Sequence, residues 1–171
     1  MKDTLSRYLA GVVDSSTRAA LRFILEPVVD RFASKQLNSA GLVIKAGGGV
    51  LAKTGATACH AIARGVLRSI AAATDMAAFS GTVANAAFNV FVHAIDSSGT
   101  LTTTMGVAGT TLALVKFPAT PVGKAVIGLT IINPTGTGDF VGGTTALDDA
   151  TVVPNAVHVS VVGTFDPSIL V

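Results

Sequence analysis

The sequence predicts a mainly β protein, with an antiparallel β-sandwich or jelly-roll-like body behind an N-terminal α-helical arm. Short β-branched and apolar runs recur from residue 42 onward, separated by Gly, Pro, Ser or Asp. Charge is concentrated before them, because residues 1–35 hold six of the 12 basic and four of the 10 acidic residues. The apolar spacing also changes at this point, from a helical period to alternation. The predicted domains are therefore an arm at residues 1–37 and a body at residues 38–171.

The arm is predicted to be helical over residues 3–35, with the capping sequence Asp14-Ser15-Ser16 before the apolar period. Pro27 is expected to kink or divide this helix near Glu26. One face carries apolar residues at three- and four-residue steps: Leu21, Ile24, Leu25, Val28 and Phe32. Another face carries charges four apart: Arg18, Arg22, Glu26 and Asp30. Such a helix either packs on its own body or docks on a neighbouring subunit or partner, and the abrupt change in composition after Lys35 favours docking.

The body is predicted to contain eight or nine short strands. Residues 87–95 alternate most clearly, with Phe88, Val90 and Val92 on one side and Asn89, Phe91 and His93 on the other. A turn, Asp96-Ser97-Ser98-Gly99, follows them. The expected strands are 42–44, 56–64, 66–72, 87–95, 101–104, 111–117, 125–132 and 157–162. Many short strands with turns between them are typical of an antiparallel sandwich or barrel.

Composition excludes several classes of function. The net charge of +2 is too small to indicate nucleic acid as a partner. The mean hydropathy of +0.63 raises the question of a membrane span, but the long charge-free stretches, 76–95 and 97–115, are interrupted by Ser, Thr, Asn and Gly. No signal peptide is expected. A body with so few charges is expected to bury apolar surface between subunits, which predicts a homo-oligomer.

Two motifs resemble chemical sites but lack what the chemistry requires. Residues 47–54 (GGGVLAKT) differ from a phosphate-binding loop at Ala52, where glycine is needed, and β-type residues follow instead of a helix. A glycine hairpin is therefore predicted. Cys59 and His60 are adjacent on a predicted strand, so they point to opposite faces and cannot form a catalytic dyad.

No metal site, cofactor or catalytic group is predicted. The three histidines, His60, His93 and His158, are scattered without metal-ligand spacing. Acidic residues lie in turns, where aspartate commonly bonds to its own backbone: Asp96, Asp139, Asp148 and Asp149. Their spacing is not that of a calcium loop. A non-enzymatic protein is expected.

The stretch 124–149 is predicted to be an assembly element. Its strand ends at Asn133-Pro134, because proline lacks the N–H that the ladder needs. A loop of Gly, Thr and Asp follows and suits a fixed shape made for contact. Phe140 and Leu147 are expected to pin this loop to the core or to a neighbour, and the candidate assembly residues are Pro134, Asp139, Phe140 and Leu147.

Residues 54–167 resemble a group of small tailed-bacteriophage virion proteins that decorate, or cement, the head. The resemblance rests on strings such as FNVFV at 88–92, DSSGTL at 96–101, GTTLALVKFP at 109–118 and IINPTGTGDFVGGTTALD at 131–148. It implies a β-rich, trimeric structural protein on the outer surface of the capsid, where it bridges subunits of the major capsid protein. An alternative is a head-fibre base or a tail-associated knob whose loops bind a host glycan.

Residues 1–35 lie outside this resemblance, so the role of the arm rests on its own pattern. Its basic residues are expected to pair with acidic capsid surface, while its apolar residues fill a groove. The candidate contact residues are Arg7, Arg18, Leu21, Arg22, Ile24, Val28, Arg31 and Phe32.

Overall fold

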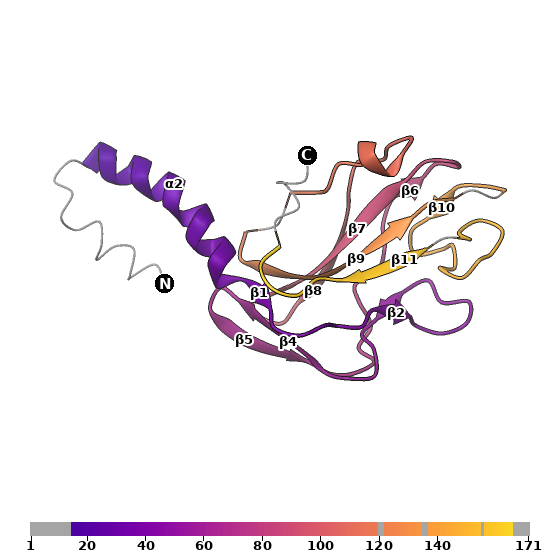
Figure 1. Ribbon diagram of the computed structural model, residues 1–171, viewed down its shortest axis with the longest axis horizontal. Coiled ribbons are helices and arrows are strands. Elements are labelled where there is room, and N and C mark those ends of the chain that lie inside the picture. Colours follow the sequence, from indigo (N-terminus) through magenta and orange to yellow (C-terminus); the bar gives the residue numbers. More distant parts are fainter. Residues whose placement is uncertain (1–14, 120–121, 135–136, 155, 166–171) are drawn as a thin grey trace.

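The computed structural model describes residues 15–119, 122–134, 137–154 and 156–165. Their elements are α2 (Ser15–Ala33), β1 (Lys35–Gln36), β2 (Val43–Ile44), β3 (Ala52–Lys53), β4 (Cys59–Ala63), β5 (Val66–Ile70), β6 (Thr82–Val83), β7 (Asn89–Asp96), β8 (Leu101–Met105), the 3-10 helix η2 (Leu112–Leu114), β9 (Lys124–Ile132), β10 (Phe140–Val141) and β11 (Val157–Ser160). The prediction of a mainly β protein with antiparallel sheets and an N-terminal helix is confirmed (Figure 1).

Two sheets form the layers of a sandwich-like body. The larger has the strand order β11-β9-β7-β8, and the smaller has the order β1-β4-β5. Figure 1 shows the smaller sheet lying across one face of the larger. Buried residues of both sheets share one hydrophobic cluster, in which Cys59 and Ala61 of β4 meet Phe91 of β7 and Ile127 of β9. Two short pairs, β2-β3 and β6-β10, extend the body away from the helix.

The larger sheet is covered on both faces. Its inner face contributes to the cluster between the layers, which contains an aromatic group in which Phe79 lies 4.9 Å from Phe91 and 6.1 Å from Phe140 between ring centroids. Its outer face forms a second cluster, which we call the outer core: Val90, Val92, Val126 and Leu129, packed against Val115, Phe117, Ile131, Val161 and Phe165. Segments 107–119 and 161–165 thus act as a lid over a sheet that would otherwise expose apolar strands.

The expected strand at 111–117 is wrong. Residues 112–114 form η2, and the segment is paired through one isolated bridge among the described residues, between Lys116 and Val107. The reason is that Val115 and Phe117 are used to cover the outer core, which leaves Leu112 and Leu114 exposed at the turn. The described residues contain eleven strands rather than eight or nine. The four additional strands are β1, β3, β6 and β10. Each has two residues, which is too short for an alternation of apolar and polar residues to be recognised.

Helix α2 confirms the predicted helix over Ser15–Ala33, while residues 3–14 of that prediction, with Arg7, lie outside the described residues. Of the two effects expected of Pro27, division of the helix is wrong, because α2 runs through this residue as one element, and a kink stays a prediction. Water can bond to the carbonyl that proline leaves without a donor, since most of this helix is exposed. Lys35 and Gln36 already form β1 of the body, slightly before the boundary expected between residues 37 and 38.

Candidate interaction surfaces

The last turn of α2 is fastened to the body. Gly65 N–H donates to the Ala33 carbonyl at 3.0 Å, and Arg64 N–H donates to Ser34 Oγ at 3.1 Å. Asp30 accepts a hydrogen bond from Gly123 N–H and lies 3.5 Å from Arg64 Nε. These contacts join the helix to the tight turn between β4 and β5, where Arg64 and Gly65 both have positive φ, and to the loop before β9. They fix the direction in which the arm leaves the body.

The rest of α2 projects from the body, as Figure 1 shows. Its predicted apolar face is solvent-exposed: Phe32 is 72%, Ile24 62%, Val28 43% and Leu25 37% exposed. The helix therefore contacts its own body through its last turn, and the apolar face before that turn does not pack along the body. Arg18, Arg22 and Arg31 also lie on α2. On the far side of the helix Phe23 is 83% exposed. We call the face formed by Leu21, Ile24, Leu25, Val28 and Phe32 the arm face.

We expect Asp30→Ala to loosen the arm without unfolding the body. The substitution removes the acceptor of Gly123 N–H and the partner of Arg64, which are half-exposed contacts that together contribute about 1 kcal/mol. Amide exchange at Gly123 should therefore rise about fivefold, while amides of β7 keep their protection. Glu26→Ala, one turn earlier on the charged face, is the matched control. Equal exchange at Gly123 in both variants would mean that Asp30 does not fasten the helix.

The four candidate assembly residues hold their loop to its own body. Phe140 and Leu147 are 0% and 1% exposed and belong to the core between the sheets. Pro134 is buried, and its carbonyl accepts from Ala86 N–H at 2.5 Å. Asp139 Oδ1 accepts from Asn85 N–H at 2.8 Å. The sequence predicts that Phe140 and Leu147 pin the loop either to the core or to a neighbour. The structure shows them pinning it to the core of their own body.

The glycine-rich segment at 47–49 forms a hairpin, as predicted. Strands β2 and β3 pair antiparallel, with Val43 opposite Lys53 and Ile44 opposite Ala52. Asp148 accepts from Gly48 N–H at 2.9 Å, and Leu147 N–H donates to the Gly49 carbonyl at 2.9 Å. The backbone N–H that a phosphate loop would present is therefore already bonded within the protein.

The acidic residues in turns serve the backbone, as their positions predicted. Asp96 accepts from the N–H groups of Ser98 and Thr100, and Asp149 accepts from those of Thr151 and Val152. Hydrogen bonds from Ser98 and Thr100 lower the pKa of Asp96. In the part of the chain that the structure describes, no group of three His, Cys, Asp or Glu residues is placed to hold a metal ion.

Two of the three histidines, His93 and His158, lie closer together in the structure than their spacing in the sequence indicates. Cys59 is buried and its neighbour His60 is exposed, which confirms that they cannot form a dyad. His93 of β7 and His158 of β11, however, are bridged by the hydroxyl of Thr130 on β9, at 2.8 and 2.9 Å. Burial lowers the pKa of His93 to about 3 and also lowers the pKa of His158. The alternation in 87–95 places His93 inside the sandwich, but only the register between strands brings the two rings together.

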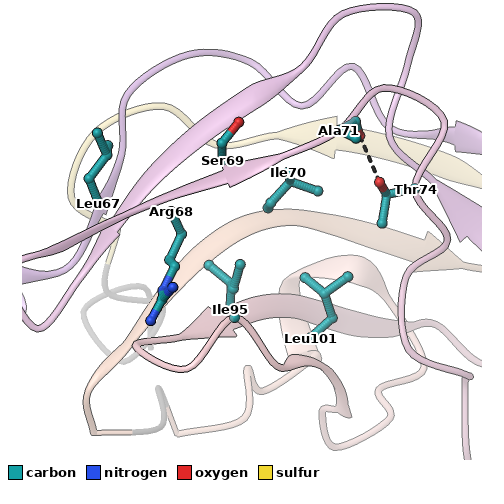
Figure 2. A pocket seen from close by; sticks show the side chains of 9 residues that line it. Leu67, Arg68, Ser69, Ile70, Ala71, Thr74, Ile95 and Leu101 are labelled. Carbon is teal, nitrogen blue, oxygen red and sulfur yellow. Dashed lines mark hydrogen bonds between the residues drawn. The ribbon is translucent and has the colours of Figure 1, made fainter.

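A pocket of about 310 Å³ opens at one side of the sandwich, between β5 and the turn that joins β7 to β8 (Figure 2). Ile70, Ile95 and Leu101 give it an aliphatic floor. Arg68 is the charged residue in its lining, and the guanidinium donates to the Ser97 carbonyl. Thr74 donates to the Ala71 carbonyl at 2.8 Å. The side chains of Arg68 and Thr74 are thus bonded to backbone carbonyls, above an aliphatic floor.

Comparison of the chain with protein-family models, with curated proteins and with solved structures finds no match. Among the described residues, no helix combines the length and the apolar character needed to cross a membrane. The arm face is therefore the feature of the described surface that most clearly calls for a functional explanation.

Proposed function

We propose that this chain is a non-enzymatic structural protein of a tailed-phage virion, which decorates the outer surface of the capsid and cements it. In this role it bridges subunits of the major capsid protein, and its β bodies associate as a trimer. The observation that carries the proposal is the projecting helix α2, whose arm face is exposed while its last turn is fastened to the body. The resemblance of residues 54–167 to head-decoration proteins supplies the partner.

The energetics of the arm face support docking on another protein. Burying one side chain of the size of Ile or Phe contributes about 1.5–3 kcal/mol, and here several such side chains remain in water. Exposed apolar rows of this kind mark interaction sites in soluble proteins. An amphipathic helix that inserts its apolar face into a groove is a common mode of recognition, read as anchors at three- and four-residue steps. Leu21, Ile24, Val28 and Phe32 have that spacing.

Cementing follows from mass action. A ligand that binds only the assembled shell stabilises assembly in proportion to its affinity and concentration. A helix held at a fixed angle also loses less conformational freedom on docking than a free peptide would. The contacts of Asp30, Arg64 and Gly123 supply that fixed angle.

The double variant Ile24→Glu with Phe32→Glu is expected to weaken capsid binding at least about 100-fold, because two buried anchors would be replaced by unpaired charges. The body should melt at an unchanged temperature, because both side chains are exposed in the isolated chain. Binding is measured by co-sedimentation with purified shells of the phage that encodes the chain. Phe23→Glu is the matched control, since Phe23 is 83% exposed but lies on the opposite side of the helix.

Full occupancy of shells by the double variant would overturn the role of the arm face. The same preparation tests the place in the virion, because the ratio of this chain to the major capsid protein on a gel gives its copy number. Hundreds of copies per particle agree with a cement protein. A handful of copies would instead indicate the head-fibre base or the tail knob.

A further inference from the structure

A continuous row of polar side chains crosses the inner face of the larger sheet from edge to edge. His158 on β11 contacts Thr130 on β9, which contacts His93 on β7, which contacts Thr103 on β8 at 2.9 Å. Thr103 in turn donates to the Ala77 carbonyl at 2.7 Å. Each strand of the sheet thus contributes one member, in the order in which the strands pair. Thr130 and His93 are 0% exposed, so the row is largely shielded from water.

The Ala77 carbonyl, at one end of the row, determines which atom carries the proton in every hydrogen bond of the row. A carbonyl only accepts, so the Thr103 hydroxyl proton goes to Ala77, and Thr103 Oγ1 must accept from His93 Nδ1–H. Neutral His93 then accepts at Nε2 from the Thr130 hydroxyl, and Thr130 Oγ1 accepts from His158 Nδ1–H. Both rings are therefore neutral Nδ1–H tautomers. In this arrangement the atom of the row with an unused lone pair on a ring nitrogen is His158 Nε2, which is buried without a partner.

Adding a proton breaks this arrangement at either ring. On His93 it would place a second N–H against Thr130, whose oxygen would face two donors while its own hydrogen lost its acceptor. On His158 it would create an Nε2–H at an atom that is buried and has no hydrogen-bond partner. A buried donor without an acceptor costs about 1–3 kcal/mol, and more when the group is charged.

The surroundings provide no compensating negative charge. No carboxylate of the described residues bonds to either ring, and Phe79 packs edge-on against His93 with centroids 5.4 Å apart. The charged residues of the strands involved, Asp96 and Lys124, lie at strand ends and bond there to Ser98 and Thr102. The titratable group that faces each histidine is the other histidine, which further disfavours a positive charge on His93.

The strand that carries His158 is one of the two edge strands of the larger sheet, and its further ties to the body include the bonds of Ser160 with Gly41 and of Gly163 with Gln36. β11 lies at the edge of its sheet and pairs only with β9 among the described strands. Residues 161–165, which follow it directly, cover the outer core through Val161 and Phe165. Detachment of β11 would therefore hydrate His158 and lift the lid from Val126 and Leu129.

We propose that the polar row is an acid-sensitive latch, which holds β11 and the segment after it in place at neutral pH and releases them when the histidines are protonated. This inference does not depend on the virion role. Because both rings bind a proton more weakly in the closed sheet than in water, acid favours the open form. The stability present above pH 6.5, the ordinary value for histidine, falls as the pH drops toward 3.

The latch is tested by hydrogen exchange of the intact chain at pH 7.5 and pH 5, corrected for the intrinsic pH dependence of exchange. Amides of 157–163 should open at least tenfold more often at pH 5, while amides of β4 and β5 change less than twofold. Burial lowers the pKa of His158 in the closed sheet, so the proton that this ring binds once β11 opens supplies the difference. His158→Asn keeps a donor toward Thr130 but cannot titrate, and it should abolish the difference. His60→Asn, an exposed histidine on β4, should leave it intact.

Either of two results overturns the proposal: an unchanged acid response in His158→Asn, or simultaneous opening of the whole body at pH 5. Should His158→Asn fail to fold, nitrogen-15 spectra of the wild-type imidazoles decide the question. Titration of His93 near 6.5 in the folded chain would refute the latch. Nδ1–H tautomers that persist below pH 5 support it.

Discussion

Phe140→Ala is expected to lower the free energy of unfolding by about 3–5 kcal/mol, the range for large-to-small changes at buried aromatic sites. Phe140 is 0% exposed and packs edge-on against Phe79 and Phe91, with centroids 6.1 and 5.9 Å away. Its removal leaves a cavity where β10, β7 and the loop before β6 meet. The aromatic contacts add to the transfer term, because edge-to-face pairs contribute about 0.5–1.5 kcal/mol beyond the buried area.

Urea denaturation followed by circular dichroism measures this loss. Phe23→Ala is the matched control, since it deletes the same atoms from a side chain that is 83% exposed, and its effect should stay within about 0.5 kcal/mol. A Phe140→Ala protein as stable as the wild type would mean that the loop 133–149 is not anchored through this ring. Because Phe140 faces its own core, we expect the loss at any protein concentration.

Gly128→Val should be the next most damaging change, at about 3 kcal/mol, the upper end for methylenes forced into a packed interior. A Cβ at residue 128 would lie 2.5 Å from Leu42 Cδ1 and 2.7 Å from the Val159 carbonyl oxygen. Leu42 can rotate away, but the carbonyl belongs to the β11 backbone. The strand must therefore shift, and the contact of His158 with Thr130 shifts with it.

The same denaturation experiment measures this effect, and amide chemical shifts of 157–160 show whether β11 moves. Gly47→Val is the control, because a Cβ at Gly47 meets nothing within 4 Å. Equal stability of the two variants would show that the spacing between β9 and β11 does not require glycine.

The sequence predicted those features that depend on long, regular patterns. The apolar run at 125–132 became β9, and the alternation in 87–95 assigned Val90 and Val92 to one face and Phe91 to the other, as the two hydrophobic clusters confirm. The exposed arm face followed from the contrast between a charged segment and an almost uncharged body. Turn positions for Asp96 and Asp149 followed from the ordinary hydrogen bonding of aspartate.

The histidine row could not be predicted, because it depends on register. Thr130 stands opposite Phe91 and His158, and the pairing of β7 with β9 shifts between His93 and Ala94. No local sequence pattern predicts where such a register shift occurs. The error at 111–117 has a similar origin, since β-type residues there cover a sheet instead of joining it. Both features are decided by contacts between segments that are distant in the chain.

The bridge between Gln36 and Gly163 has a consequence for biosynthesis. Gln36 N–H donates to the Gly163 carbonyl at 3.1 Å, and Gly163 N–H donates back at 2.7 Å. The first strand of the body therefore cannot complete its pairing until residue 163 has been translated, and the hairpin at Gly48 likewise requires Asp148. Contacts so far apart in sequence slow folding and leave strand edges open meanwhile. The nascent chain should therefore leave the ribosome with β1 unpaired on this side, and it should close only after residue 163 has emerged.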